Sequence, residues 1–259
     1  MHNNIENTRW AAKLISEILK DLSQKVEVGM NLLGLEEYAK FLMNKYDVKS
    51  YNKGYKPEWA LKPYPNILCL SVNHVLNHGV VKDYVLKEGD ILTIDLGIIY
   101  KDAVGDAAIT VPVGKITNKN ERLLRYAKKA VYVGIDQIRA GAKVTDIGAA
   151  IQLFVERIGK YKVNENLSGH AIGFEMHQKP QVPMHDVTSR LTGEVPILEA
   201  GMVLCIEPHI TFDTPHAYLD QEDKWSVCTL DKKNAAVFEH MVEVLPDGYN
   251  ILTNHFRLD

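Results

Sequence analysis

The segment LTIDLGIIYKDAVGDAAITVPVG, residues 92–114, reads as two apolar β-strands that each contain an aspartate. Asp95 lies within TIDLG, and Asp106 lies within GDAAIT. A carboxylate in apolar surroundings is unfavourable unless it is protonated, paired or bound to a metal ion. A hairpin that turns near Lys101 and Asp102 would bring the two aspartates side by side and leave Asp102 in solvent. The segment therefore predicts a hairpin with two carboxylates that need a compensating group.

The composition suits one large globular domain or two small ones. The chain has 259 residues, 46% of them hydrophobic, with a formal net charge of −3. Because no linker of low complexity interrupts it, a single domain over residues 1–259 is the simplest interpretation. The balanced charge, without a long basic run, gives no reason to expect binding to nucleic acid or to a membrane surface. No apolar stretch approaches the roughly 20 residues that span a bilayer. The three cysteines have no paired spacing, which favours reduced thiols in the cytoplasm, and a monomer is the simplest assembly.

A unit of two helices joined at a glycine occurs twice in the sequence. The first covers residues 8–46 with its glycine at Gly29, and the second covers 120–161 with its glycine at Gly141. If the repeat is real, two halves would build one layer of strands with helices over one face and a site between them. The halves would be residues 1–115 and 116–259. Chance repetition is the alternative for so loose a pattern.

Sequence typical of β-strands follows each helical unit. The expected strands cover residues 67–72, 91–99, 105–113, 170–173, 203–210, 225–230 and 236–245. Residues 49–66 and 178–199 are interrupted by prolines, and we expect them to be ordered loops. Helices and strands in this order predict an α+β fold.

Two glutamates and a histidine occur in similarly apolar or glycine-rich surroundings. They are Glu207 in VLCIEPHI, Glu239 in AVFEHMVEV and His170 in GHAIG. Together with Asp95 and Asp106 they give four carboxylates that would repel one another strongly, because their own segments offer no cationic partners. Two divalent cations would relieve the repulsion, and four carboxylates with one imidazole suit Mn, Fe, Co or Zn. Bridging carboxylates would hold the ions roughly 3.5–4 Å apart, which suits hydrolysis by a shared water. A network of buried acids without a metal is the alternative.

Five stretches, in this order, resemble the methionine aminopeptidases, metallopeptidases with the pita-bread fold. They are SVNHVLNHGV, GDILTIDLGIIYKDAVGDAAIT, GHAIGFEMHQKPQVP, GMVLCIEPHI and FEHMVEVLPDGYNILT. The resemblance covers nearly the whole chain. It implies a pseudo-twofold antiparallel sheet with helices on the outer face and the site on the inner face. It also implies removal of the N-terminal methionine from nascent polypeptides with a small second residue, in contact with the ribosome.

The resemblance gives each chemical residue a role. The implied metal ligands are Asp95, Asp106, His170, Glu207 and Glu239. Of these, Asp106 and Glu239 would bridge the two ions, and Glu207 would pass the proton of the attacking water to the leaving amine. His78 would contact the substrate near its scissile amide. His177 would hydrogen-bond the substrate carbonyl as charge develops on its oxygen.

A methionine pocket is implied in the same way. The residues at the matching positions are Tyr64, Cys69, Met176 and Trp225, together with His78 and His177. Such a pocket suits an unbranched thioether, because sulfur packs well on the edges of aromatic rings. Simple core packing is the alternative reading of Tyr64 and Trp225.

Several positions depart from the family's usual pattern. They are His74 in place of an acid, Ala171 in place of a glycine, Met176 in place of an aromatic residue, and Gln178 and Lys179 in place of acids. The chain after His78 also lacks the usual proline, so we expect that loop to be less rigid. All of the implied metal ligands are retained, and only the shape of the pocket would change.

The short spacing between Glu207 and Glu239 leaves no room for the insertion of the type II enzymes and therefore indicates a type I enzyme. Two alternatives remain at this point. One is a related aminopeptidase of another specificity, such as an Xaa-Pro enzyme, and the other is a non-catalytic binding relative. The ligand types do not select one metal, since oxygen-rich sites bind several.

Overall fold

The predicted hairpin is present in the computed structural model, which describes residues 5–190 and 192–257. Strands β4 (Ile91–Tyr100) and β5 (Ala103–Pro112) pair antiparallel along their whole length. Lys101 and Asp102 form the turn, and Lys101 adopts a φ of 53°, as tight hairpin turns require. Asp102 is exposed and accepts a hydrogen bond from the Asn7 side chain at 2.6 Å. The predicted turn position is therefore confirmed.

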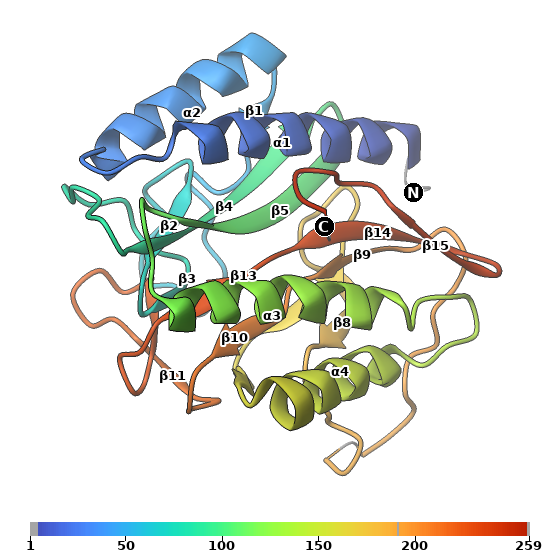
Figure 1. Ribbon diagram of the computed structural model, residues 1–259. Coiled ribbons are helices and arrows are strands. Elements are labelled where there is room, and N and C mark those ends of the chain that lie inside the picture. Colours follow the sequence, from blue (N-terminus) through green and yellow to red (C-terminus); the bar gives the residue numbers. More distant parts are fainter. Residues whose placement is uncertain (1–4, 191, 258–259) are drawn as a thin grey trace.

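The helices follow the predicted apolar periodicity. The described helices are α1 (Ile5–Lys25), α2 (Leu32–Tyr46), α3 (Asn118–Ile135) and α4 (Val144–Gln152), with a π-helical turn η1 (Leu153–Gly159) directly after α4. Side-chain caps fix where two of them begin, because Asn31 accepts from the Leu33 amide and Thr117 from the Asn120 amide. In Figure 1, α1 and α2 lie over the strands of the first half, while α3 and α4 lie over those of the second.

The strands form antiparallel sheets. Besides β4 and β5 they are β1 (Lys49–Ser50), β2 (Cys69–Val72), β3 (Val75–Asn77), β6 (Lys162–Val163), β7 (Ser168–Ala171), β8 (Gln178–Pro183), β9 (Val203–Ile206), β10 (His209–Thr211), β11 (Ala217–Leu219), β12 (Val227–Thr229), β13 (Ala235–Val237), β14 (His240–Leu245) and β15 (Gly248–Ile251). The first half carries the order β1-β4-β2 with β5 beside β4, and the second carries β15-β14-β9-β7-β8. Two three-stranded sheets, β13-β10-β6 and β11-β12-β3, complete the layer.

Two strands predicted as continuous are interrupted. The predicted strand 203–210 splits into β9 and β10 at Glu207, which precedes a proline that has no amide hydrogen to donate. The predicted strand 236–245 splits into β13 and β14 at Glu239. The predicted loop 178–199, whose residue 191 lies outside the described residues, contains β8, and the predicted loop 49–66 begins with β1. Strands β3, β6, β11 and β15 were not predicted either. A very short strand has too few residues to show an alternating pattern in the sequence. Whether such a segment forms a strand depends on the neighbouring strand with which it pairs.

Residues before and after position 115 contribute to the same main hydrophobic cluster and are joined by specific hydrogen bonds. The hydroxyl of Thr110 on β5 donates to the carbonyl oxygen of Val237 at 2.7 Å and accepts from the Val237 amide at 2.8 Å. The Glu239 amide donates to the Ala108 carbonyl at 3.0 Å. Arg9 of α1 also forms an ion pair with Glu243 of β14 at 2.8 Å. The β4–β5 hairpin is therefore held directly against the strands of the second half.

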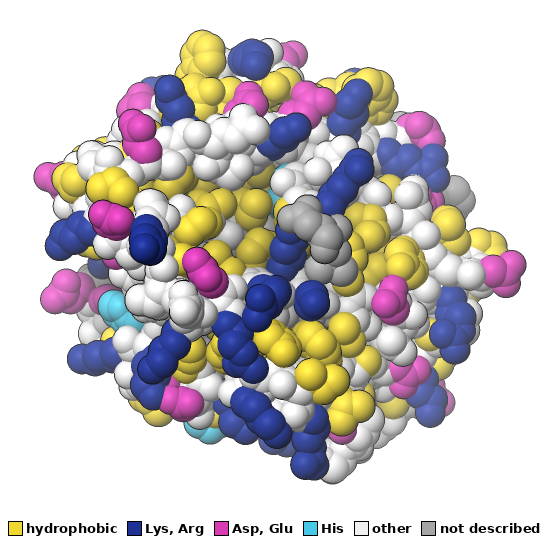
Figure 2. Space-filling view, viewed as in Figure 1, with side chains coloured by type: hydrophobic (Ala, Val, Ile, Leu, Met, Phe, Trp, Pro, Cys, Tyr) yellow, Lys and Arg dark blue, Asp and Glu magenta, His cyan; other side chains and the backbone are white. Residues whose placement is uncertain are grey.

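The helix-covered side is a mixed, solvated surface. Figure 2 shows acidic and basic side chains spread over this side, with basic ones gathered over α3. Within residues 5–190 and 192–257, none of the helices has the length and apolarity that crossing a bilayer requires.

Candidate metal centre and substrate cleft

The β4–β5 hairpin brings Asp95 and Asp106 to one face of the sheet. Asp95 lies opposite Ala108, and Asp106 lies opposite Gly97, so the two aspartates are diagonal neighbours. A Cβ atom on Gly97 would come within 2.2 Å of Met176 Cε and 2.7 Å of Asn52 Oδ1. The glycine therefore leaves room for the side chains that gather opposite Asp106.

The second half supplies His170, Glu207 and Glu239 to the same place. His170 Nε2 lies 3.6 Å from Asp106 Oδ2 and 3.4 Å from Glu207 Oε1. Glu207 and Glu239 occupy the breaks that interrupt the two predicted strands. Glu239 is 3% exposed, and its Oε1 atom has no hydrogen-bond partner among the described residues. All five predicted metal ligands thus converge from the two halves.

The pKa values of three carboxyl groups indicate that their negative charges lack compensating positive charge. Burial raises the pKa of Asp95, Glu207 and Glu239 well above the usual range, and the neighbouring charge of Asp106 raises each of them further. A cluster of this kind must take up protons or cations to remain buried.

The donor atoms are close enough to surround cations. Two groups of possible ligands are present. In the first, one ligand atom from each of Asp106, His170, Cys205 and Glu239 lies within 4.8 Å of the other three. In the second, the ligand atoms of Cys69, His78 and Asp95 lie within 4.8 Å of one another. The orphaned Glu239 oxygen points to the same conclusion, since a bound cation would give it a partner. The residues present therefore fit a site for divalent metal ions.

Three histidines surround the acids. The His177 ring lies 4.5 Å from the His170 ring, and its Nδ1 lies 3.0 Å from the Tyr55 hydroxyl. The pKa of both His78 and His177 is lowered to about 4, first by burial and second by a neighbouring histidine. Burial also lowers the pKa of His209, whose Nε2 lies 3.9 Å from Glu207, to about 3. These rings are therefore neutral near pH 7.

A cleft of about 1400 Å³ opens over this cluster, and its walls include Asp95, Asp106, His170, Glu207, Glu239, His78, His177, Tyr64, Cys69, Met176 and Trp225. The Tyr64 and Trp225 rings meet edge to face at 5.1 Å, and the His78 and Trp225 rings at 6.3 Å. Tyr64, Cys69 and Trp225 belong to one buried apolar cluster, whereas Met176 belongs to a neighbouring one with Cys205. The pocket residues implied by the sequence are thus brought together in two adjoining groups.

Sequence reasoning missed several residues of the site. They are Asn52, Tyr55, Trp59, Asn77, Cys205 and His209. Cys205 follows from strand register, because it lies opposite His170 on the neighbouring strand. Burial raises the pKa of the Cys205 thiol well above its usual range, with a further contribution from Glu239. His209, two residues after Glu207, carried a weak signal in the sequence, whereas the long loop that contains Tyr55 carried none.

Comparison with known proteins agrees with the geometry. The model of metallopeptidase family M24 matches residues 6–246. A methionine aminopeptidase of Aquifex aeolicus is 37% identical over 250 residues, which cover 96% of this chain and 95% of the relative. The crystal structure of methionine aminopeptidase from Rickettsia prowazekii superposes with a TM-score of 0.89 at 32% identity and covers 96% of each chain.

A more distant match supports the fold alone. The prolidase from Pyrococcus furiosus superposes with a TM-score of 0.74 at 21% identity, and the matched region covers 98% of this chain and 64% of that one. The predicted pita-bread fold is confirmed by this match and by the closer one. The chain therefore belongs to the methionine aminopeptidases of metallopeptidase family M24.

Proposed function

We propose that this chain removes the N-terminal methionine from nascent polypeptides whose second residue is small. The observation that carries the proposal is the meeting of four carboxylates and His170 beneath a cleft with aromatic and sulfur-containing walls. Full-length similarity to methionine aminopeptidases at 37% identity supports this specificity over an Xaa-Pro specificity. We further propose one catalytic unit over residues 1–259, acting as a monomer in the cytoplasm and meeting its substrates at the ribosome.

We assign Asp95, Asp106, His170, Glu207 and Glu239 as the ligands of two divalent ions, drawn from Co, Mn, Fe and Zn. Once bound, such ions would supply Lewis acidity and a water of lowered pKa. The raised pKa values of the buried carboxylates support this assignment, because cations would replace the protons that these groups otherwise retain. Asp106 and Glu239 are the proposed bridging ligands.

The remaining steps belong to side chains of the chain itself. Glu207 accepts a proton from the attacking water and delivers it to the leaving amine. If the Tyr55 hydroxyl donates to His177 Nδ1, the neutral ring keeps its proton on Nε2. That proton can then be donated to the substrate carbonyl oxygen as negative charge develops there. His78 orients the scissile amide, and Tyr64, Cys69, Met176 and Trp225 enclose the methionine side chain.

The test is methionine release from Met-Ala-Ser by protein loaded separately with Mn, Co, Fe or Zn. Ala-Pro-Ser serves as the Xaa-Pro substrate, and Glu239→Gln is the inactive control. Release of methionine with at least one metal, without cleavage of Ala-Pro-Ser, is the expected result. An absence of methionine release with every metal, from folded protein, would overturn the proposal.

A further inference from the structure

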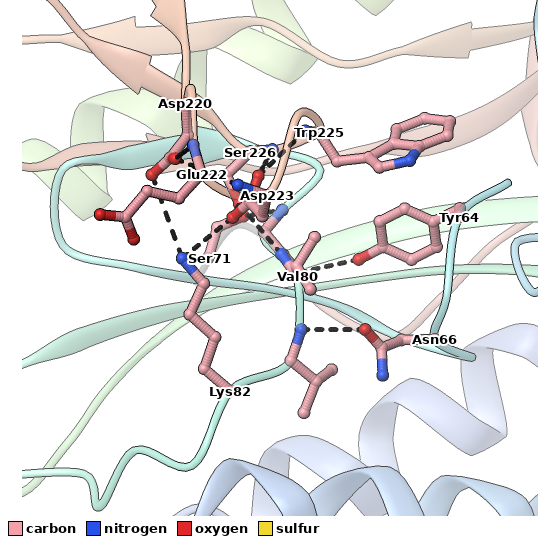
Figure 3. Close-up of polar contacts among 12 residues, drawn as sticks. Tyr64, Asn66, Ser71, Val80, Lys82, Asp220, Glu222, Asp223, Trp225 and Ser226 are labelled. Carbon is pink, nitrogen blue, oxygen red and sulfur yellow. Dashed lines mark hydrogen bonds and ion pairs between the residues drawn. The ribbon is translucent and has the colours of Figure 1, made fainter. Parts of the chain in front are cut away.

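The loop that follows His78 meets the loop that precedes Trp225 beside the cleft. Both residues line the cleft, and their rings lie in edge-to-face contact. The sequence suggested that the first loop is less rigid, because it lacks the usual proline. Figure 3 shows a set of polar contacts that connects residues 80–82 with residues 220–226.

Asp223 is the centre of these contacts. Its Oδ1 accepts hydrogen bonds from the amides of Trp225 at 2.9 Å and Ser226 at 2.8 Å. Its Oδ2 accepts from the Ser226 hydroxyl at 2.7 Å and forms an ion pair with Lys82 Nζ at 2.9 Å. The side chain of Asp223 is only 10% exposed. Hydrogen bonds to an ionised carboxylate are stronger than neutral ones, so this residue fixes the backbone of Trp225 firmly.

Ser226 extends the network to the first loop. Its hydroxyl donates to Asp223 and accepts from the Val80 amide at 3.1 Å. The next amide, that of Val81, donates to the Asn66 side chain at 3.1 Å. The Tyr64 hydroxyl donates to the carbonyl of Gly79 at 2.8 Å. The segments that carry Tyr64, His78 and Trp225 are thus tied to one another.

We propose that Asp223 and Lys82 are positioning residues for the substrate pocket, which hold His78 and Trp225 at their working separation without touching the substrate. This inference rests on the proposed function, because it assigns those two residues to the pocket. The ion pair of Lys82 with Asp223 restrains the loop after His78, as the usual proline would do in other members of the family.

The electrostatics of the pair are consistent with this role. Burial alone would raise the pKa of Asp223, but hydrogen bonds from Ser226 and Trp225 and the contact with Lys82 lower it overall. Burial acts against the charge of Lys82 too, yet Asp223 raises the pKa of Lys82 above its usual value. Both groups are therefore charged near pH 7.

The test compares Asp223→Asn and Lys82→Met with wild type, using Met-Ala-Ser and Leu-Ala-Ser as substrates. We expect kcat/KM for Met-Ala-Ser to fall about tenfold to a hundredfold, mainly through KM, since small displacements of positioning groups have effects of this size. The preference for Met over Leu should narrow, and bound metal measured by elemental analysis should stay unchanged. Lys82→Arg, which keeps the charge, should retain most of the wild-type value.

Hydrogen exchange gives a readout that does not depend on activity. The amides of Val80, Trp225 and Ser226 should exchange faster in both variants, whereas those of β4 and β5 should not change. Glu156→Gln is the matched control, because it breaks a partly buried ion pair, with Lys162 at 3.2 Å, away from the cleft. It should leave kcat, KM and these amides as in wild type.

The outcomes separate the two proposals. If wild type releases no methionine, the proposed function fails, and the exchange data still decide whether Asp223 and Lys82 restrain the loops. If wild type is active but the two variants keep its KM and its preference for Met, the positioning role is wrong. Equal losses in kcat and in bound metal would also overturn it, since they would indicate general damage.

Discussion

Asp106 affects every other acid of the site. After burial, its charge is the largest cause of the raised pKa values of Asp95, Glu207 and Glu239. It also lies 3.6 Å from His170. This central position explains why one aspartate on a strand governs both the repulsion in the cluster and its capacity for cations.

Replacing Asp106 should therefore separate metal binding from folding. Asp106→Ala is expected to abolish methionine release and metal binding, while its metal-free form unfolds at the same or a higher temperature because repulsion is relieved. Asp102→Ala is the control, since Asp102 is exposed in the hairpin turn and its carboxylate accepts a hydrogen bond from the Asn7 side chain. Elemental analysis and a peptide assay measure both effects. Loss of metal from Asp102→Ala, with Asp106→Ala normal, would refute the assignment.

At the residue scale, local sequence was enough to single out the acids but not their neighbours. Asp95 and Glu239 stand out because each interrupts an apolar stretch. A carboxylate in such a stretch is unfavourable unless it is protonated, paired or bound to a metal ion. Cys205 does not stand out, because a cysteine is an ordinary residue in an apolar strand. Its closeness to His170 depends on how β7 and β9 pair, which is a long-range property.

Helix α4 packs directly on β8 through a glycine. A Cβ atom on Gly148 would come within 2.4 Å of the His185 carbonyl oxygen and 2.5 Å of the Pro183 carbonyl oxygen. The backbone there cannot move without shifting the strand beside His170. A side chain added to α4 at Gly148 would therefore displace β8 and, through it, the strand that carries His170.

Gly148→Ala should destabilise the protein by about 1–3 kcal/mol, as overpacking usually does. Gly34→Ala offers a matched control, because Gly34 lies on α2 with nothing within 4 Å of its added Cβ. That change should stabilise the protein by roughly 0.5–1 kcal/mol, since alanine is the better helix former. Urea denaturation compares the two. If Gly148→Ala left the protein as stable as Gly34→Ala does, or more stable, the packing argument would be wrong.

The segment after β15 carries a buried histidine that should make stability depend on pH. His255 Nε2 donates a hydrogen bond to the Ala108 carbonyl oxygen at 3.1 Å, and burial lowers the pKa of His255 to about 4. The unfolded chain binds a proton at this histidine below about pH 6.5, whereas the folded chain stays neutral until about pH 4. Stability should therefore fall as the pH decreases from 6.5 to 4, by up to roughly 1.4 kcal/mol per pH unit.

The contribution of His255 can be isolated by comparing variants. Between pH 7 and 5, urea denaturation of metal-free His255→Asn should show a shallower loss of stability than wild type. His216→Asn, at an exposed histidine, should keep the wild-type slope. Identical slopes for wild type and His255→Asn would exclude this histidine as the source.

At the element scale, the long helices and the hairpin were predictable, because their periodicity extends over many residues. The interruptions at Glu207 and Glu239 were not predicted. The proline after Glu207 is a sequence signal for the first interruption, whereas no proline or glycine marks the second, where HMVEVL follows Glu239. The π-helical turn η1 continues the apolar pattern of α4, so the sequence alone does not reveal the change in helical pitch.

The whole molecule places ligands from both halves around one site. Cations that bind only the folded chain stabilise it in proportion to the logarithm of their concentration, about 2.7 kcal/mol at a hundred times Kd. We expect Mn or Co to raise the unfolding temperature of wild type and to leave that of Asp106→Ala unchanged. Differential scanning calorimetry with and without chelator measures the shift, and equal shifts for both proteins would contradict the proposed site.

The effect of metal should also depend on pH. Burial raises the folded-state pKa values of Glu207 and Glu239, so the metal-free protein retains protons that the unfolded chain releases as the pH rises above about 4. The protons retained in the folded state stabilise the metal-free protein at low pH. This contribution is lost as the pH rises toward the folded-state pKa values. Cations replace those protons, so the stabilisation by metal should grow with pH.

The joining of β5 to β13 and β14 has a consequence for how the protein is made. Residues 95 and 106 leave the ribosome long before residue 239, and a chain that carries only the first half has two of the five proposed ligands. Domains fold as units during synthesis. A newly made chain should therefore gain its hydrolytic capacity in one late step, and incomplete products of interrupted translation should be harmless to the peptides around them.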